Sequence, residues 1–316
     1  MDRPSRSLKE ELHQAPTHEI PSLGCALERR SSCCDGIGYR LQPKGSLTHA
    51  ELCSCVQECA SCFGQNRRMV DGVAKTCRTP APSRVVTLIN NATLPARYSG
   101  ARLDSFSNFT GNGRDIVQRV SHWKDDFQLD KPRGLLLSGP VGVGKTYLLA
   151  ALAKSFAAKG VSVRFVDFFQ LLLALKAGYA EDKNEAGLLN EMIEVDILMI
   201  DELGKGRCSD WELSVLDQLV MGRYNRNKII VASTNYSLKP LTRVNTHNVS
   251  LDGTGSSSTF DLDTSESLEK RITSRVFSRL CETSDFIELK GEDFRRLSNQ
   301  EKAQQLRAPT AGRRPV

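Results

Sequence analysis

Apolar runs alternate with amphipathic stretches through the last two-thirds of the chain. Five runs predict β-strands, at 134–138, 161–166, 195–200, 229–233 and 285–289. All but the last are almost continuously apolar, which is typical of strands buried on both faces of a sheet. The stretches between them predict helices at 113–127, 145–158, 167–178, 185–193, 210–226 and 266–282. This alternation predicts an α/β fold, a parallel sheet with helices on both faces.

Composition divides the chain into further parts. We expect a loose polar N-terminus (1–24), a cysteine-rich module (25–78), a linker and lead-in segment (79–111), the α/β domain (112–296) and a disordered basic tail (297–316). Within the α/β domain, residues 245–265 are mostly small and polar, which predicts a flexible insertion.

The overall composition supports a globular protein. The chain has 316 residues, of which 40% are hydrophobic, so it can form one medium domain and a smaller one. The N-terminus has no signal-peptide core, and no apolar stretch approaches the roughly 18 residues of a membrane span. We therefore expect a cytoplasmic location. A net charge of +6 favours nucleic-acid contact only weakly.

One segment has the form of a phosphate-binding loop. Residues 139–146 read Gly-Pro-Val-Gly-Val-Gly-Lys-Thr, between a predicted strand and a predicted helix. Glycines let successive backbone N–H groups point at phosphate oxygens, beside the positive end of the helix dipole. Lys145 would contact the β- and γ-phosphates, and Thr146 would ligate Mg²⁺. The expected nucleotide contacts are Gly139, Pro140, Val141, Gly142, Val143, Gly144, Lys145, Thr146, Tyr147 and Asp201.

Two further strands end in polar residues. The run 195–200 is followed by Asp201 and Glu202, a Walker B pattern in which Asp201 would hold Mg²⁺ and Glu202 would polarise the attacking water. The run 229–233 leads to Asn235, which would sense the γ-phosphate or orient that water. The three motifs predict an ATPase with ATP and Mg²⁺, built on a P-loop sheet with an added central strand.

With these motifs in place, the chain resembles the AAA+ family of DnaC-like helicase loaders and IstB-like transposition ATPases over residues 94–296. Further segments carry the resemblance: Leu94-Pro-Ala-Arg-Tyr98, Asp201-Glu-Leu-Gly204, Asp210-Trp-Glu-Leu213, Arg223-Tyr-Asn-Arg226, Ser233-Thr-Asn-Tyr-Ser237 and Leu289-Lys-Gly-Glu-Asp-Phe-Arg295. It implies self-assembly with shared ATP sites, single-stranded DNA, and a replicative helicase or a transposase as partner. As in the loaders, the short stretch after Arg279 leaves no room for a C-terminal helical lid.

Arginines 271, 275 and 279 repeat every four residues, so one helix would place them on one face. The resemblance implies that Arg279, with Arg275 second, reaches the neighbouring subunit's nucleotide as an arginine finger. The alternative is a solvated basic face or a contact to DNA phosphate.

Eight of the ten cysteines lie between Cys25 and Cys77, a distribution that favours structural zinc over disulfides in a chain without an export signal. The candidate ligands are Cys33, Cys34, Cys53, Cys55, Cys59, Cys62 and Cys77. Three alternatives stay open: one site made only by Cys53, Cys55, Cys59 and Cys62, an iron–sulfur cluster, or reduced thiols.

Two basic groups could contact DNA. The first group is Lys176, Tyr179 and Lys183, which offer charge and stacking for DNA or belong to an ordinary core helix. The second group is Arg223, Arg226 and Lys228, which in the simpler interpretation are ordinary surface residues. For function, the first hypothesis is helicase loading in DNA replication and the second is an accessory role in transposition. A third is an ATP-switched protein adaptor that does not bind DNA.

Overall fold

A computed structural model describes residues 34, 37–54, 56, 67–76, 82–106, 112–180, 185–238 and 267–296. Internal contacts divide the chain into two compact units, residues 1–40 with 51–84, and residues 41–50 with 85–316. The candidate functional residues of the α/β domain all belong to the second unit.

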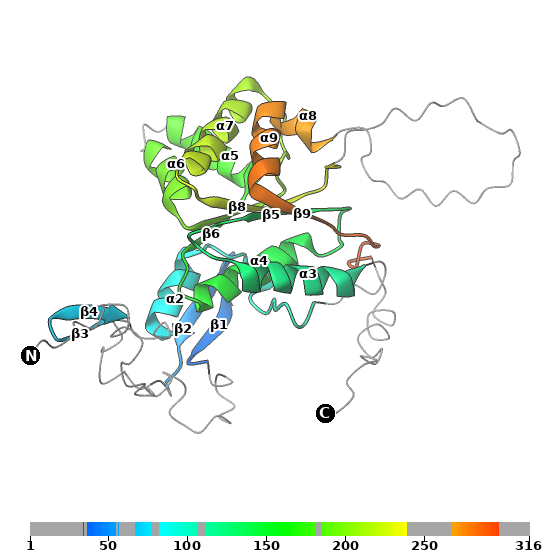
Figure 1. The fold of residues 1–316 in the computed structure, drawn as a ribbon. Helices are drawn as coiled ribbons and strands as arrows, with labels where there is room; N and C mark the ends of the chain where they lie inside the picture. Colours follow the sequence, from blue (N-terminus) through cyan, green and yellow to red (C-terminus); the bar gives the residue numbers. More distant parts are fainter. Residues whose placement is uncertain are drawn as a thin grey trace, which may run out of the picture. The chain divides into compact units, whose positions relative to one another are not determined.

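The second unit is built on a five-stranded parallel sheet with the strand order β6-β7-β8-β5-β9 (Figure 1). The strands are β5 (Gly134–Ser138), β6 (Val163–Asp167), β7 (Ile197–Asp201), β8 (Ile229–Thr234) and β9 (Ser284–Glu288). Every residue of β5, β7 and β8 is buried, as their apolar runs predict. Strand β8 lies between β5 and β7, which confirms the added central strand.

The register gathers the strand ends at one edge of the sheet. Asp167 pairs with Asp201 across β6 and β7, and Ser138 pairs with Thr234 across β5 and β8. In parallel sheets this carboxyl-terminal edge is where ligands bind, because the loops that follow the strands meet there. The three sequence motifs therefore converge on one place.

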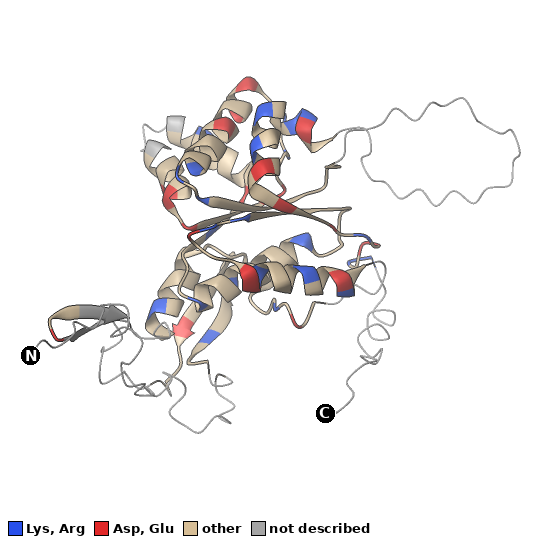
Figure 2. Ribbon diagram, in the orientation of Figure 1, with Lys and Arg blue, Asp and Glu red and all other residues tan. Residues whose placement is uncertain are grey.

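Helices cover both faces of the sheet (Figure 1). Helices α3 and α4 lie on one face, and α5 to α9 lie on the other. Their bounds are α3 (Gly113–Asp126), α4 (Lys145–Ala158), α5 (Phe168–Ala180), α6 (Glu185–Glu194), α7 (Asp210–Asn225), α8 (Leu268–Ile272) and α9 (Ser274–Thr283). Figure 2 shows that the charged residues lie mainly on these helices, while β5 and β8 carry none.

Helix α4 positions the phosphate-binding loop because it is fixed on nearly all sides. Most of its residues are buried, so it is held between the sheet and the outer helix α3. Trp123 and Phe127 at the end of α3 meet Phe156 of α4, with ring centroids 5.8 Å and 4.9 Å from it. These edge-to-face contacts lock the two helices together.

Two expectations about helices were wrong. The helix predicted at 266–282 is two helices, because Thr273 has a φ of 71° and its hydroxyl accepts a hydrogen bond from Val276 N, as the N-cap of α9. Within the segment predicted as linker and lead-in, a helix forms, α2 (Pro82–Asn91). Its proline stands at the first helical position, where no backbone N–H is needed.

A β-hairpin supports the segment that follows α2. Strands β1 (Tyr39–Lys44) and β2 (Leu47–Leu52) form it, and Thr48 N donates to Leu94 O at 2.7 Å while Ala96 N donates to Ser46 O at 2.9 Å. These bonds fix the backbone just before the short 3₁₀ helix η1 (Ala96–Tyr98).

In the cysteine-rich region, β3 (Arg67–Val70) and β4 (Val73–Thr76) form a second antiparallel pair. Cys34 and Cys53 are buried. The predicted ligands Cys33, Cys55, Cys59, Cys62 and Cys77 lie outside the described residues. Among the residues that are described, no three His, Cys, Asp or Glu side chains come together as a metal site. No described helix is both long and apolar enough to cross a bilayer.

Candidate active site

The loop after β5 has the backbone of a phosphate-binding loop. Gly142 and Gly144 have φ values of 84° and 99°, in the left-handed region that favours glycine. A Cβ on Gly142 would lie 1.8 Å from the carboxylate of Asp293, so a side chain there would displace the C-terminal segment. Gly144 is the N-cap of α4, so the loop opens directly onto the helix N-terminus.

Lys145 is buried at the start of α4, with 6% of its surface exposed. Its ammonium donates to the carbonyl oxygens of Gly139 and Pro140, both at 2.7 Å. Burial lowers the pKa of Lys145 to about 8, although the nearby carboxylates of Asp201 and Glu202 raise it. An ammonium held in this way is poised to gain from any added negative charge, such as a phosphate.

Asp201, at the end of β7, is the buried carboxylate of the site. Burial raises its pKa, hydrogen bonds from Ser233 and Thr146 oppose the rise, and the charges of Glu202 and Asp167 add to it. The buried carboxylate and the hydroxyls of Ser233 and Thr146 all line the same cavity and form an oxygen donor set suited to Mg²⁺. Thr146 and Asp201, the residues predicted to hold Mg²⁺, thus belong to one cavity.

Glu202 adopts an uncommon backbone conformation, with a φ of 56°. Its N–H donates to Ser233 Oγ at 3.1 Å, and the same hydroxyl donates to Asp201. Ser233 therefore joins the two acidic residues of the Walker B pattern. The carboxylate of Glu202 also forms an ion pair with Lys205. Neither Ser233 nor Lys205 was a predicted site residue.

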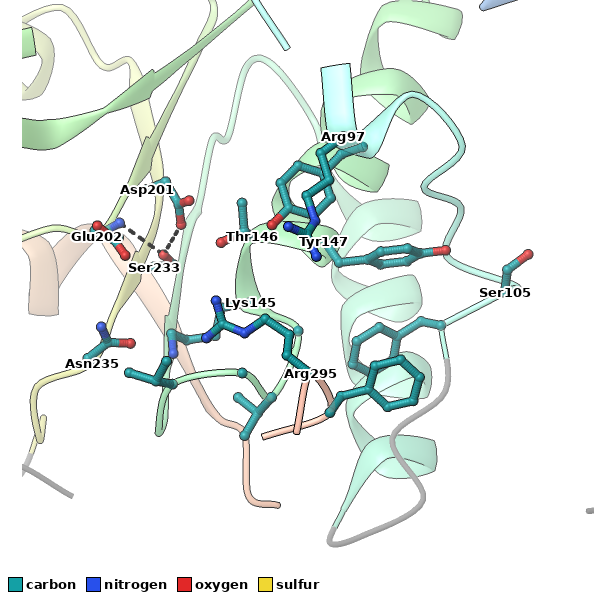
Figure 3. Close-up of a pocket in the computed structure, with 17 residues that line it drawn as sticks. Arg97, Ser105, Lys145, Thr146, Tyr147, Asp201, Glu202, Ser233, Asn235 and Arg295 are labelled. Atoms are coloured by element: carbon teal, nitrogen blue, oxygen red, sulfur yellow. Dashed lines mark hydrogen bonds between the residues drawn. The ribbon is translucent and has the colours of Figure 1, made fainter. Parts of the chain in front are cut away.

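Ten of the predicted residues line one cavity of about 520 Å³, whereas Gly139 and Pro140 are not among its lining residues (Figure 3). Lys145 and Thr146 face Asp201, Glu202 and Asn235 across it. From the sequence prediction, the cavity is lined by Val141, Gly142, Val143, Gly144, Lys145, Thr146, Tyr147, Asp201, Glu202 and Asn235. Its other lining residues are Arg97, Tyr98, Ser105, Phe106, Ser233, Phe294 and Arg295.

One wall of the cavity is aromatic and comes from the lead-in segment. The rings of Phe106 and Tyr147 are 5.9 Å apart, and Arg97 and Tyr98 of η1 extend this wall. Lys154 of α4 holds η1 in place by donating to Ser99 O at 2.7 Å. For the part of this wall that comes before α3, the motif Leu94-Pro-Ala-Arg-Tyr98 is the only sequence signal, and nothing local assigns it a role.

The segment after β9 closes another side. Phe294 N donates to Gly142 O at 3.2 Å, and Leu289 N donates to Ser138 O at 2.7 Å. These bonds bring Arg295 into the cavity, where its charge acts to lower the pKa of Lys145. Arg295 was not a predicted site residue, although it ends the motif Leu289-Lys-Gly-Glu-Asp-Phe-Arg295. Through Arg296, the described chain after β9 forms no lid helix.

Arg275 and Arg279 lie away from the cavity of their own chain, on α9. Arg279 donates to Tyr224 OH at 3.1 Å and to Glu282 at 3.0 Å, and its guanidinium stacks on the Tyr224 ring at 4.4 Å. Arg275 is 3.6 Å from Asp217. Because Thr273 breaks the helix, Arg271 does not continue their face, which corrects the predicted row of three arginines.

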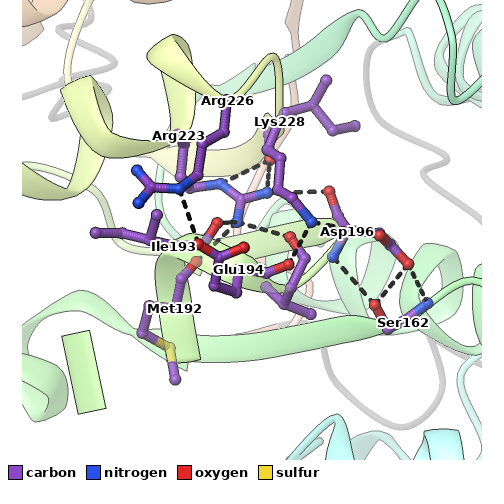
Figure 4. A network of polar contacts seen from close by, with 10 residues as sticks. Ser162, Met192, Ile193, Glu194, Asp196, Arg223, Arg226 and Lys228 are labelled. Atoms are coloured by element: carbon purple, nitrogen blue, oxygen red, sulfur yellow. Dashed lines mark hydrogen bonds and ion pairs between the residues drawn. The ribbon is translucent and has the colours of Figure 1, made fainter. Parts of the chain in front are cut away.

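Both interpretations of Arg223, a DNA contact and an ordinary surface residue, are wrong, because its side chain is fully buried (Figure 4). Its guanidinium donates to carbonyl oxygens at the end of α6 and the starts of β7 and β8, those of Met192, Ile193, Val195, Asp196 and Ile229. Arg226 and Lys228 are on the outside and pair with Glu194 and Asp196. Of the predicted basic cluster, Arg223 thus forms a buried structural network, and Arg226 and Lys228 lie at its outer edge.

The other predicted basic group is only partly described. The ammonium of Lys176 lies over the Trp211 ring at 5.2 Å. Lys183 and the side chain of Tyr179 are outside the described residues.

With this geometry, the comparison with known families has a clear result. The family described as IstB-like ATP binding protein matches residues 75–246, which include the phosphate-binding loop, the Walker B pattern and Asn235. The chain belongs to this family. An ATP-binding family accounts for a buried lysine and a buried carboxylate on opposite sides of one cavity.

Curated relatives come from two settings. The replicative helicase loader DnaC of Escherichia coli is 29% identical over 110 residues, which cover 34% of this chain and 45% of DnaC. A Geobacillus stearothermophilus protein, named as an ATP-binding protein of insertion sequence IS5376, is 28% identical over 149 residues, or 47% of this chain and 57% of that protein. The chain spans about half the length of these relatives.

Among solved structures, the crystal structure of the DnaC helicase loader superposes with a TM-score of 0.50 at 26% identity, covering 61% of this chain and 99% of the other. The fold is therefore that of a P-loop NTPase of the AAA+ class, as predicted.

Proposed function

We propose that the protein hydrolyses ATP at a site shared between neighbouring copies and uses the cycle to place a partner protein on DNA. The observation that carries the proposal is the arrangement of Lys145 and Thr146 opposite Asp201 and Glu202 around one cavity. In the reaction, water attacks the γ-phosphorus of ATP, the bond to the β-phosphate oxygen breaks, and ADP and phosphate leave.

Each residue has a defined part in this proposal. The loop N–H groups and Lys145 hold the triphosphate, Asn235 orients the attacking water, and Glu202 accepts its proton. Thr146 and Asp201 would hold Mg²⁺, which when bound neutralises charge on the β- and γ-phosphates. Arg279, with Arg275 second, would reach the nucleotide of the adjacent copy, since neither lines the cavity of its own chain.

The test is Glu202→Gln. This variant should bind ATP normally, while turnover falls by about 100-fold or more, because a general base contributes on the order of 10²–10⁴. Normal hydrolysis would show that Glu202 is misassigned. Arg279→Ala should bind ATP yet lose only the turnover that rises with protein concentration, since a finger acts across the interface.

For the partner, we propose a replicative helicase first, on the basis of the DnaC relatives. A transposase is the second candidate, because the relative from insertion sequence IS5376 matches a longer part of the chain. Affinity capture with Glu202→Gln and ATP, probed for each protein, separates them. Salt-sensitive, ATP-dependent binding to single-stranded DNA is expected in both cases, and its absence would favour an adaptor that does not bind DNA.

We also propose structural zinc in the cysteine-rich region. Supporting it, each buried cysteine begins a tight turn: Ile37 N donates to Cys34 O and Val56 N donates to Cys53 O, both at 3.0 Å. Tight turns of this kind suit a tetrahedral thiolate site. Metal analysis of the purified protein decides, and the proposal fails when zinc is absent and all ten cysteines titrate as thiols.

A further inference from the structure

The loop that carries Glu202 needs support from outside. Glu202 has a φ of 56°, a conformation that is unfavourable for a non-glycine residue and persists only when neighbours fix it. On the side of β8 the support is Ser233 Oγ, which accepts from Glu202 N, and Thr234 Oγ1, which donates to Leu203 O at 2.9 Å. The other side of the loop faces helix α8.

Arg271 of α8 provides that second support. Its Nε donates to Gly204 O at 3.1 Å, and Nη2 of the same guanidinium donates to Gly206 O. The guanidinium also lies 5.1 Å from the ring centre of Tyr236, next to Asn235. One side chain therefore contacts the loop that follows Glu202 and the residue that follows Asn235.

The packing between this loop and α8 is close. Gly204 has a φ of 87°, and a Cβ there would lie 3.0 Å from Leu268 Cδ1 and 3.3 Å from Arg271 Cβ. Helix α8 is itself fixed, because Leu268 and Ile272 are fully buried and Leu268 N donates to Ser237 O at 2.8 Å. Arg271 thus projects from the well-fixed helix α8 toward the strained loop that follows Glu202.

We propose that Arg271 is a positioning residue, which holds the loop after Glu202 so that its carboxylate stands at the attacking water. This inference rests on the proposed ATP hydrolysis.

The experiment compares Arg271→Ala and Arg271→Lys with the exposed neighbour Lys270→Ala. For Arg271→Ala, turnover should fall by roughly 10- to 100-fold, the usual effect of misplacing a catalytic group by about 1 Å, while the Kd for ATP changes by less than about twofold. Arg271→Lys should lie between alanine and wild type, because an ammonium cannot donate in a fixed fork to two carbonyls. Lys270→Ala should behave as wild type.

A double-mutant cycle separates positioning from a general structural role. In a Glu202→Gln background, Arg271→Ala should change turnover by less than about twofold, because its effect passes through the missing carboxylate. A further loss as large as that in the wild-type background would overturn the inference, as would unchanged turnover of Arg271→Ala and Arg271→Lys. Arg271→Lys keeps the charge and the stem over Tyr236, so it carries the test alone when the alanine variant does not fold.

The two proposals fail differently. Normal turnover of Glu202→Gln by itself would contradict the proposed function. Loss of turnover in Glu202→Gln together with normal turnover in both Arg271 variants would contradict only the positioning role.

Discussion

Replacing Arg223 by methionine tests the buried network directly. The substitution keeps an unbranched stem of similar length but removes the guanidinium, so five carbonyl oxygens lose their donor: those of Met192, Ile193, Val195, Asp196 and Ile229. Two of them, Met192 and Ile193, lie in the last turn of α6, where no intrahelical N–H is available. Strands β7 and β8 both start at this network.

The size of the effect follows from two opposing contributions. A net loss of about 1 kcal/mol for each carbonyl gives about 5 kcal/mol in all. Against this, burial lowers the pKa of Arg223 to about 9, so the charged guanidinium is itself costly to bury, and removing it returns part of the loss. We expect the free energy of unfolding to fall by about 3 kcal/mol, a large part of the 5–15 kcal/mol typical of a domain.

Urea unfolding of the nucleotide-free protein, followed by tryptophan fluorescence, measures this change. Trp211 belongs to α7, the helix of Arg223, and Trp123 belongs to α3 on the other face of the sheet. Arg226→Met is the matched control. Arg226 is an exposed neighbour paired with Glu194, and its loss should cost less than about 1 kcal/mol. Equal midpoints for the two variants would refute the reasoning.

Three further predictions concern the cavity. The affinity for ATP should be constant below pH 8 and fall about tenfold per pH unit above it, because Lys145 in the nucleotide-free protein has a pKa of about 8 and must take up a proton to hold the phosphates. Fluorescent-ATP titrations from pH 7 to 9.5 check this, and the control variant Lys154→Met should show the same slope. Ser233→Ala should lower turnover by about tenfold and raise the Mg²⁺ concentration that half-maximal turnover requires, because Asp201 and Glu202 N both lose a hydrogen-bond partner worth about 1–3 kcal/mol. Turnover measured against Mg²⁺ concentration tests this prediction, and a curve equal to that of the wild type would contradict it. Lys205→Met should raise basal turnover by at most about fivefold at constant ATP affinity, because it frees the Glu202 carboxylate from an exposed ion pair. Lower turnover would show that Lys205 assists hydrolysis instead.

The sheet could be predicted because its information is local. An apolar run such as Gly134–Ser138 is buried on both faces, and the strand found there has the predicted bounds. The helix break at Thr273 could not be predicted in this way, because helical periodicity continues through 266–282 and nothing in it indicates a left-handed threonine. On both sides of the break apolar residues are buried in one core cluster, Leu268 and Ile272 from α8 and Val276 and Leu280 from α9, so the break accompanies tertiary packing that the sequence alone does not display.

Arg223 was mispredicted for a related reason. Three basic residues within six positions are typical of a surface, since arginine is rarely buried without a carboxylate partner. The network satisfies this arginine with backbone oxygens from Met192 to Asp196, about thirty positions earlier in the chain. Residue type alone indicates the cost of burying a charge, but it does not reveal backbone carbonyl partners that only the tertiary fold brings together.

Ser233 and Arg295 differ in how far the sequence could have led to them. Ser233 lies near the end of β8, and the sequence already predicted that strand in the centre of the sheet; its position beside Asp201 follows once β8 is placed next to β7. Strand order was therefore sufficient for Ser233. Arg295 lies seven residues beyond the end of β9, and it enters the cavity because Phe294 N bonds back to Gly142 O. A site residue is thus predictable when it lies on a helix or strand whose place in the fold is known. A coil segment that folds back onto the site has no periodicity from which its path could be derived.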